Sequence, residues 1–219
     1  MYLLLLAPFL LSVGTPAGLP EVTVSYQAQF AISIDTQRLS GTLYHSQNRK
    51  RLDYTIGDSN FSLLLLKAEK LAWLLLPEAP IQFNIPLGAS HLASGLLETA
   101  TLQKGASVGS KSINGIPSKG FSITLTHSDD AIYEGLIWLA PQNIPIKIQL
   151  KRSPKEPRSS SAPHHFNFTL SKLVIQPLSP QVFEVPQNIN TLDLGELMTL
   201  SPPISVPGDP KTYFDSPSP

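Results

Sequence analysis

The chain has 219 residues, which suits one domain with short appendages, and 15% of them are charged. Its 16 basic residues balance its 16 acidic ones, which argues against a nucleic-acid-binding surface because such surfaces carry a basic excess. The sequence contains no cysteine, so a disulfide framework, a thiolate metal site and a cysteine nucleophile are excluded.

The N-terminal stretch MYLLLLAPFLLSVGTPAGLP has the pattern of an export signal. Leu3 to Val13 form an apolar core, and small residues near Gly14 to Gly18 suit a signal peptidase. The apolar run is shorter than the roughly 20 residues of a membrane-spanning helix. No Lys or Arg precedes it, so an upstream translation start or an apolar N-terminal strand is the alternative. We expect residues 1–17 to be a signal peptide and the mature protein to be periplasmic.

Alternating apolar and polar residues predict antiparallel strands with one buried face through most of the chain. The alternation is clearest from Val22 to Ile34, where every second residue is apolar. Short polar turns separate the runs, and Asn114-Gly115 is the residue pair that a type I′ hairpin turn prefers. Further strands are expected at 39–44, 51–56, 63–66, 71–76, 81–87, 106–113, 121–125, 131–139, 144–150 and 166–175.

Two of the predicted strands are apolar at every position. Leu63 to Leu66 and Leu71 to Leu76 would place hydrophobic side chains on both faces of a sheet, as strands of a covered parallel sheet do. The turns beside them, 67–70 and 77–80, are too short for parallel crossovers, so the strands must be antiparallel. Some apolar element therefore has to cover each face of the sheet at this point.

One stretch has the period of a helix instead. Between residues 88 and 103 the apolar side chains recur mostly at spacings of three and four, and Ser90 can cap the start. The apolar positions are Ala89, Leu92, Ala93, Leu96, Leu97, Ala100 and Leu102. One side of this helix, Ala89 to Leu102, must therefore lie against an apolar surface.

These elements predict a mainly β fold of about ten antiparallel strands in meander order, with one short helix. A single curved sheet whose concave face wraps around the helix would form a half-open β-barrel. We expect this domain to extend over residues 20–189. Residues 190–219 are rich in Pro and Ser and lack periodicity, so they are expected to form a disordered tail.

Five segments, taken together and in order, resemble the LolA/LolB-like outer-membrane lipoprotein-sorting superfamily over residues 21–189. A Gly-containing strand precedes a charged one in SGTLYHSQNRKRLDY, and a Lys stands three residues before a Trp in SLLLLKAEKLAWLLLPEAPIQFNIP. The hairpin SINGIPSKGFSITL, the strand pair EGLIWLAPQNIPIKIQL and the closing VFEVPQNI complete the series.

Members of that superfamily fold as an unclosed antiparallel β-barrel covered by helices, and its carriers hold lipoprotein acyl chains in the apolar interior. The resemblance implies a non-enzymatic periplasmic carrier that binds lipids or lipoproteins and needs no cofactor. This chain departs from the carriers because its strand pattern begins without their first amphipathic helix. The carriers also have an arginine near the end of their second strand that helps to latch the helical lid. This role is not carried over to a residue of this chain, because Arg49 and Arg51 lie near that position but Gln47 aligns there equally well.

A cavity for acyl chains would be lined by apolar side chains of the hairpins, the helix and the strand around Trp138. Ordinary core packing is the alternative for each of these side chains. The predicted lipid-binding residues are Leu64, Leu66, Trp73, Leu75, Phe83, Leu92, Leu96 and Trp138.

The sequence shows no catalytic or metal-binding constellation. Its one G-x-S-x-G match, GASVG at residues 105–109, falls at the start of a predicted strand and is not followed by a helical pattern, so it is not a nucleophile elbow. No phosphate-binding glycine loop is present. The adjacent His164 and His165 would point to opposite faces of a strand, so they would not share a metal ion. We expect lipid acyl chains and a protein of the outer or inner membrane as partners, and no nucleic acid. The alternative function is a cargo-free envelope interaction or sensor module on the same fold.

Overall fold

The computed structural model describes residues 21–76, 78–79, 81–86, 101–126, 132–153, 165–187 and 189–193. These residues form one twelve-stranded sheet. Its strands are β1 (Tyr26–Ile34), β2 (Gln37–Ser46), β3 (Arg49–Ile56), β4 (Ser59–Leu66), β5 (Leu71–Leu76), β6 (Ile81–Pro86), β7 (Thr101–Ile113), β8 (Ile116–Thr126), β9 (Ile132–Leu139), β10 (Pro145–Arg152), β11 (His165–Ile175) and β12 (Asn190–Asp193). The 3-10 helices are η1 (Lys67–Glu69), η2 (Pro141–Asn143) and η3 (Pro180–Phe183).

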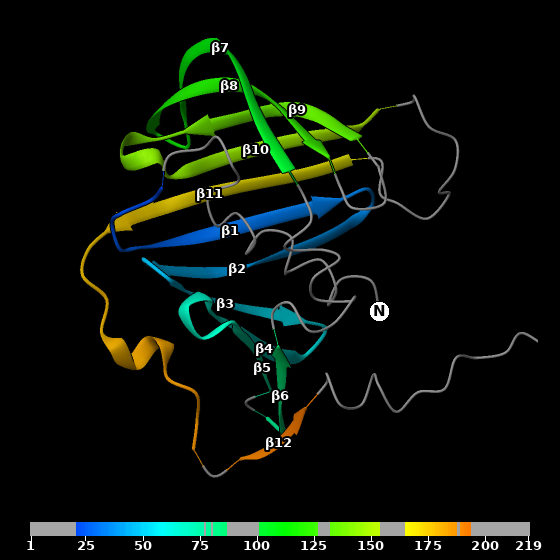
Figure 1. Ribbon diagram of the computed structural model, residues 1–219, viewed down its shortest axis with the longest axis vertical. Helices are drawn as coiled ribbons and strands as arrows, with labels where there is room; N and C mark the ends of the chain where they lie inside the picture. The colour runs from blue at the N-terminus through cyan, green and yellow to red at the C-terminus, as the bar shows by residue number, and fades with distance from the viewer. Residues whose placement is uncertain are drawn as a thin grey trace, which may run out of the picture.

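The strand order is β12-β6-β5-β4-β3-β2-β1-β11-β10-β9-β8-β7 (Figure 1). Every neighbouring pair is antiparallel except β12 and β6, which run parallel. The prediction of a mainly β, antiparallel and unclosed sheet is confirmed. The expected single meander is wrong, because β1 pairs with β11 as well as with β2 and thereby joins two meanders, β1–β6 and β7–β11.

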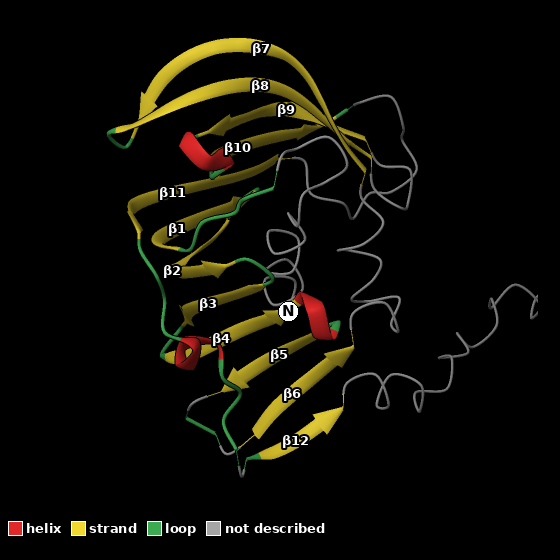
Figure 2. Ribbon diagram, turned by 60° about the vertical axis from the view of Figure 1, so that its left-hand side comes forward, coloured by secondary structure: helices red, strands yellow, loops and turns green. Residues whose placement is uncertain are grey.

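This strand order favours a curved sheet. The chain leaves β6 at Pro86 and resumes in β7 at Thr101, ten strand-to-strand steps away. Ten steps across a flat sheet would need about 48 Å, and a connection of this length reaches at most about 50 Å when fully extended. Figure 2 shows that the sheet instead curves strongly from β7 to β12, which brings its two ends closer.

Three predictions at the borders of the domain have different outcomes. The predicted helix, Ala89 to Leu102, lies outside the described residues except for its last two positions. At those positions the prediction is wrong: Thr101 and Leu102 belong to β7, where Leu102 pairs with Leu125. Asn190–Asp193 were assigned to the tail, yet they form β12 because they pair with the edge of β6. The predicted signal peptide, 1–17, also lies outside the described residues.

The two faces of the sheet differ. We call the face that carries Phe30 and Phe168 the inner face, and the opposite one the outer face. The main core covers the inner face, where Phe30 is 2% exposed and packs over Gly41 of β2. A β-carbon at Gly41 would collide with the carbonyl oxygen of Asp53, so glycine is what allows β2 and β3 to approach here.

Candidate functional site

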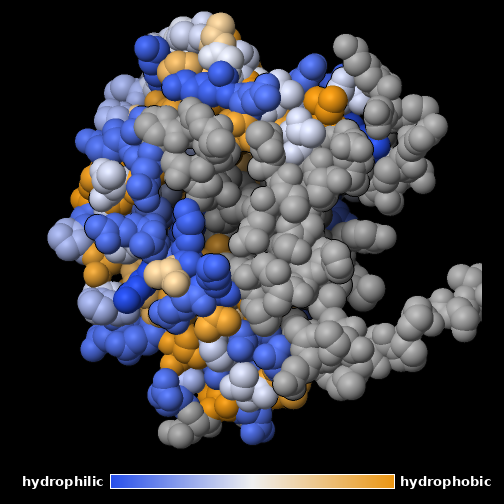
Figure 3. Space-filling model, in the orientation of Figure 1, coloured by the Kyte–Doolittle hydropathy of each residue, from blue (hydrophilic) through white to orange (hydrophobic). Residues whose placement is uncertain are grey.

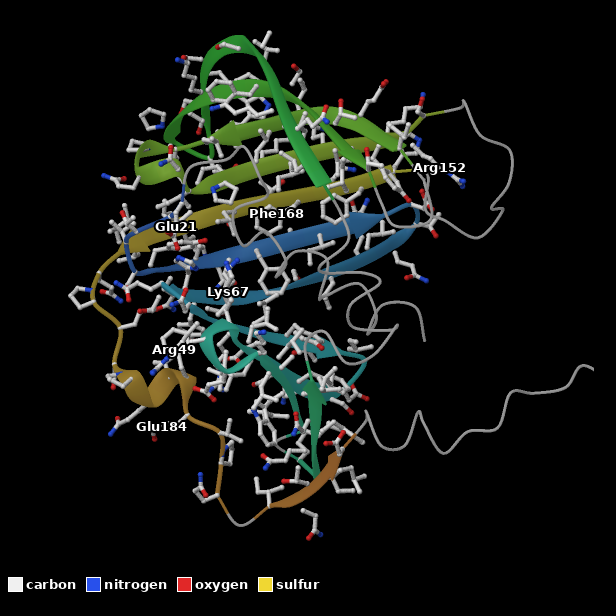
Figure 4. The ribbon with its side chains drawn as sticks, viewed as in Figure 1. Glu21, Arg49, Lys67, Arg152, Phe168 and Glu184 are labelled. Carbon is white, nitrogen blue, oxygen red and sulfur yellow. The ribbon has the colours of Figure 1, made fainter. Side chains whose placement is uncertain are left out.

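Two rows of paired side chains make most of the inner face apolar. Because paired residues of neighbouring strands point to the same face, each row can be followed across the sheet. The first row runs from β2 to β8 through Leu39, Ile32, Phe168, Ile148, Ile137 and Phe121. The second runs from β1 to β12 through Ala28, Leu43, Leu52, Leu63, Leu74, Phe83 and Leu192. Figure 4 labels Phe168 on β11, near the middle of the sheet.

The second row becomes more exposed toward the edge of the sheet. Leu63 is 4% exposed, Leu74 and Phe83 are half-buried, and Leu192 on β12 is 41% exposed. Figure 3 shows hydrophobic residues reaching the surface in the lower part of the view, in the region of β4 to β6. Because Leu192 is exposed, this row of the inner face is accessible at the β12 end of the sheet.

A separate apolar cluster lies on the outer face of β4. Leu64 and Leu66 are 0% and 7% exposed, and they pack with Phe183 of η3, which is 4% exposed. Tyr44, Trp73, Leu178, Val182 and Val185 surround these three residues. The segment that follows β11 thus covers the outer face, which explains why β4 is apolar at consecutive positions.

Arg51 fastens this covering segment to the sheet. Its Nη1 donates a hydrogen bond to the carbonyl oxygen of Val182 at 3.0 Å, and its Nη2 donates to Ser62 Oγ at 3.2 Å. Its Nε lies 2.7 Å from Asp53 Oδ1, which also accepts a 2.6 Å bond from Ser62 Oγ. The network ties β3 and β4 to η3 across a long stretch of sequence.

Polar side chains interrupt the inner face at one end of β2 and β3. Tyr26, His45 and Lys50 are paired in register on adjacent strands, and Lys50 is paired in turn with Leu65. The rings of Tyr26 and His45 are stacked with centroids 4.9 Å apart. Lys67, in the turn after β4, is close by, since its backbone N–H donates to the carbonyl oxygen of Asn48 at 2.9 Å (Figure 4).

Burial changes the protonation of these groups. It lowers the pKa of His45 to about 4, with repulsion from Lys50 as a smaller cause, while a contact with the Val22 carbonyl opposes the shift. Burial and then repulsion from Lys67 lower the pKa of Lys50 to about 8. The pKa of Tyr26 is raised, also by burial. At neutral pH this end of the inner face therefore holds an uncharged imidazole beside ammonium groups.

Two buried polar atoms of the inner face lack a hydrogen-bond partner within the described residues. They are Nδ1 of His45 and the hydroxyl of Tyr54. Tyr54 stacks on Phe61 at 5.7 Å, and burial raises the pKa of its hydroxyl to about 12. Unpaired buried polar atoms are costly, so each one marks a place where a ligand atom could bond.

The structure separates the residues predicted to bind lipid. Leu64, Leu66, Trp73 and Leu75 point to the outer face, because they are paired with one another, with Ser62 or with Arg49 and Arg51. Phe83 points to the inner face. Leu92 and Leu96 lie outside the described residues, and the lipid-binding role of all eight residues stays a prediction.

Trp138 lies apart from the other predicted residues, on β9. It is paired with Gly120, where a β-carbon would come within 2.7 Å of the indole ring, and Lys111 Nζ lies 4.0 Å from the ring centroid. The pairing places it opposite to the side of Ile137, which belongs to the inner face. Trp138 is 6% exposed and packs as a core residue.

Leu63, Leu65 and Leu74 belong to the inner face but are not among the residues that the sequence pattern predicts to bind lipid. The alternation in β3 was the signal that could have found them. Leu52 and Tyr54 are apolar there, whereas Arg51 and Asp53 are polar, and a tight β3–β4 turn places Leu63 opposite Leu52. The charged residues of β3 therefore indicate that Leu64 faces outward.

The described residues offer no sign of a metal site or a membrane helix. They contain no group of three or more His, Asp or Glu side chains placed to hold a metal ion. None of the helices in the described ranges combines the length and the apolar character that crossing a bilayer requires.

This chain is similar to known proteins in structure but not in sequence. No protein family and no curated protein matches the chain by sequence. An uncharacterized conserved protein from Thermus thermophilus is similar over 88% of this chain and 98% of its own, with a TM-score of 0.52 and 11% identity. The MucA/MucB complex of Pseudomonas aeruginosa gives a TM-score of 0.47 and 14% identity, over 78% of this chain and 59% of that one. The Mycobacterium tuberculosis lipoprotein LppX gives 0.41 and 17%, over 80% and 97%.

At these identities the similarity concerns the fold. The fold is an unclosed, strongly curved antiparallel sheet with an apolar inner face. The unclosed antiparallel sheet that the resemblance to the LolA/LolB-like superfamily implies is confirmed as the fold of this chain.

Proposed function

We propose that this protein is a non-enzymatic periplasmic carrier that holds the acyl chains of a lipid or of a lipidated protein against its inner face. The observation that carries this proposal is the apolar row that continues from buried Leu63 to half-buried Leu74 and Phe83, and on to exposed Leu192. An apolar surface that remains accessible at an open sheet edge is suited to an apolar ligand.

The ligand in this proposal contacts Leu74, Phe83 and Leu192. The outer cluster around Leu64 and Leu66 is occupied by Phe183, which supports a structural role for it. The contribution predicted for Leu92 and Leu96 is kept in the proposal. Burial of about ten methylene groups would favour binding by about 8 kcal/mol before the cost of association is subtracted.

The first test is to purify the chain from a bacterial envelope and to record its mass under native conditions. We expect a population with the added mass of one lipid, and the same lipid in an organic extract. A bare polypeptide in the mass spectrum, together with no binding of a fluorescent fatty acid, would refute the carrier function.

Two leucines of β5 provide a matched pair of variants. Leu74 and Leu71 are both half-buried, but Leu74 points to the inner face and Leu71 to the outer face. We expect Leu74→Asn to weaken fatty-acid binding about tenfold, since a polar group would meet the acyl chain, and Leu71→Asn to leave it nearly unchanged. Equal losses for both variants would mean that binding follows stability and not contact with the inner face.

A second candidate function is a cargo-free interaction module, and the edge strand β7 favours it. β7 is 13 residues long, forms one border of the described sheet and carries Val108 at 45% exposure. Such a strand can pair with an extended segment of another protein, although its two irregularities near Ser107 oppose long pairing. Recovery of a protein partner that a Val108→Pro variant no longer binds would favour this function.

A further inference from the structure

We propose that His45, Lys50 and Lys67 form a subsite for an acidic lipid head group, a carboxylate or a phosphate, at one end of the inner face. This inference rests on the proposed function and adds the chemical class of the ligand. It follows from three observations: the position of the two ammonium groups, an unpaired nitrogen in a buried imidazole, and the apolar path that begins beside them.

The two lysines lie together at the edge of an apolar surface. Lys50 points to the inner face from β3, and Lys67 begins the turn after β4. Each ammonium group repels the other strongly enough to contribute to the lowered pKa of Lys50. The same turn also carries Glu69 and Lys70, both exposed. An anion bound between the two ammonium groups would relieve this repulsion.

His45 supplies a directional group at the same place. Its side chain is 4% exposed, its ring is held by stacking on Tyr26, and its Nε2 lies 3.5 Å from the carbonyl oxygen of Val22. Its other nitrogen, Nδ1, has no partner among the described residues. A fixed ring with one unpaired nitrogen can bond the hydroxyl of a protonated acid, or can take up a proton and donate to an anion.

The apolar path for the rest of the ligand begins directly beside these groups. On the inner face Lys50 is paired with Leu65, and the next pair along the same two strands is Leu52 with Leu63. From Leu63 the row continues to Leu74, Phe83 and Leu192. A head group at Lys50 would therefore place an acyl chain along the row that is proposed to bind it.

Ligands with one chain and different head groups test this subsite. The lipid-free protein is loaded with Nile red, a neutral dye, which dodecanol, dodecanoate, dodecyl phosphate and dodecyltrimethylammonium then displace. We expect one or both anions to displace the dye at about tenfold lower concentration than dodecanol, as a charge-assisted hydrogen bond would allow, and the cation to be weakest. The comparison of dodecanoate with dodecyl phosphate distinguishes the two acidic groups.

Variants of similar shape assign the preference to these residues. Lys50→Met keeps the length of the side chain and should reduce the preference for anions to less than about threefold. Lys147→Met is the control, because Lys147 is paired with Thr169 on the opposite face. His45→Phe retains the stacking on Tyr26 and should lose part of the preference. Lys67→Gln, in an exposed turn, provides a variant whose folding is not at risk.

The outcomes separate this inference from the carrier function. Displacement by dodecanol, dodecanoate and dodecyl phosphate at equal concentrations would overturn the subsite and leave the carrier function intact. An anion preference that persists in both Lys50→Met and Lys67→Gln would also overturn it. If no ligand displaces the dye and no lipid is bound, the carrier function fails, and the subsite fails with it.

Discussion

The four leucines at the end of β4 belong to two different environments. Leu63 and Leu65 face the main core on the inner side, whereas Leu64 and Leu66 face Phe183 on the outer side. The outer side is closed by a segment that Arg51 holds in place, and the inner side remains accessible at its β12 end. The run of four leucines therefore packs under a covering segment on one face, and on the other face it joins the apolar surface that we propose binds the ligand.

The largest loss of stability should come from a substitution that uncovers the apolar cluster on the outer face. Phe183→Ala would remove a ring that is 4% exposed and would leave Leu64 and Leu66 uncovered. We expect a loss of about 3–5 kcal/mol in the free energy of unfolding, measured by urea denaturation. Val174→Ala is the control, since Val174 is 49% exposed and its loss should be small. A small effect of Phe183→Ala would show that the segment after β11 does not cover the sheet in solution.

The inner face should make the stability of the protein depend on pH, because it contains the buried His45. The pKa of His45 is lowered from 6.5 in the unfolded chain to about 4 in the folded protein. Between these two values the unfolded state binds the extra proton, so the free energy of unfolding falls as the pH is lowered from 6.5 to 4. The loss attributable to His45 is about 3 kcal/mol, and below about pH 4 it should not grow further.

His45→Phe isolates this contribution from that of the carboxylates. The variant should lose less stability than the parent chain between pH 6.5 and about pH 4, as measured by thermal unfolding at several pH values. The same slope in both proteins would mean that His45 is already accessible to protons in the folded state.

The amino-acid pattern predicts the strands and their turns well, but it does not predict which distant segment covers the outer face. Alternation predicts the strands, and Asn114-Gly115 predicts its hairpin turn, because both are local: Asn114 and Gly115 have the positive φ values of 50° and 79° that this turn requires. The pairing of β1 with β11 and of β12 with β6 depends on contacts between distant parts of the chain, which local patterns do not encode. The partner of Leu64, Phe183, is likewise remote in sequence and follows a different strand.

A smaller effect should come from loosening the segment that covers the outer side. Arg51→Met would remove the hydrogen bonds to Val182 and Ser62 and the ion pair with Asp53, which would keep its hydrogen bond from Ser62. Because the side chains of Arg51 and Asp53 are 26% and 34% exposed, solvent would offset part of the loss, and we expect about 1–2 kcal/mol. Arg49→Met, two residues earlier on the same face and exposed, should have little effect.

A double-mutant cycle tests whether Arg51→Met and Phe183→Ala act on the same part of the molecule. Arg51 and Phe183 both hold η3 on the sheet, so the double variant should lose less stability than the sum of the single variants. Additive losses would indicate that the hydrogen bonds and the aromatic contact stabilise separate parts of the molecule.

The smallest effect concerns β12, where the two faces differ within a single short strand. On the outer face Gln82 Nε2 donates a 2.9 Å hydrogen bond to Thr191 Oγ1, and on the inner face the neighbouring Leu192 is 41% exposed. Thr191→Val keeps the shape of the side chain but leaves the amide of Gln82, which is 4% exposed, without this acceptor. We expect a loss of about 1 kcal/mol, seen as faster hydrogen exchange of the β12 amides while the exchange of β1 and β11 is unchanged. If Thr191→Val also weakens fatty-acid binding, the hydrogen bond on the outer face positions the part of the inner face that contacts the ligand at the sheet edge. If the β12 amides exchange as before, the parallel backbone pairing with β6 is sufficient to hold β12 in place.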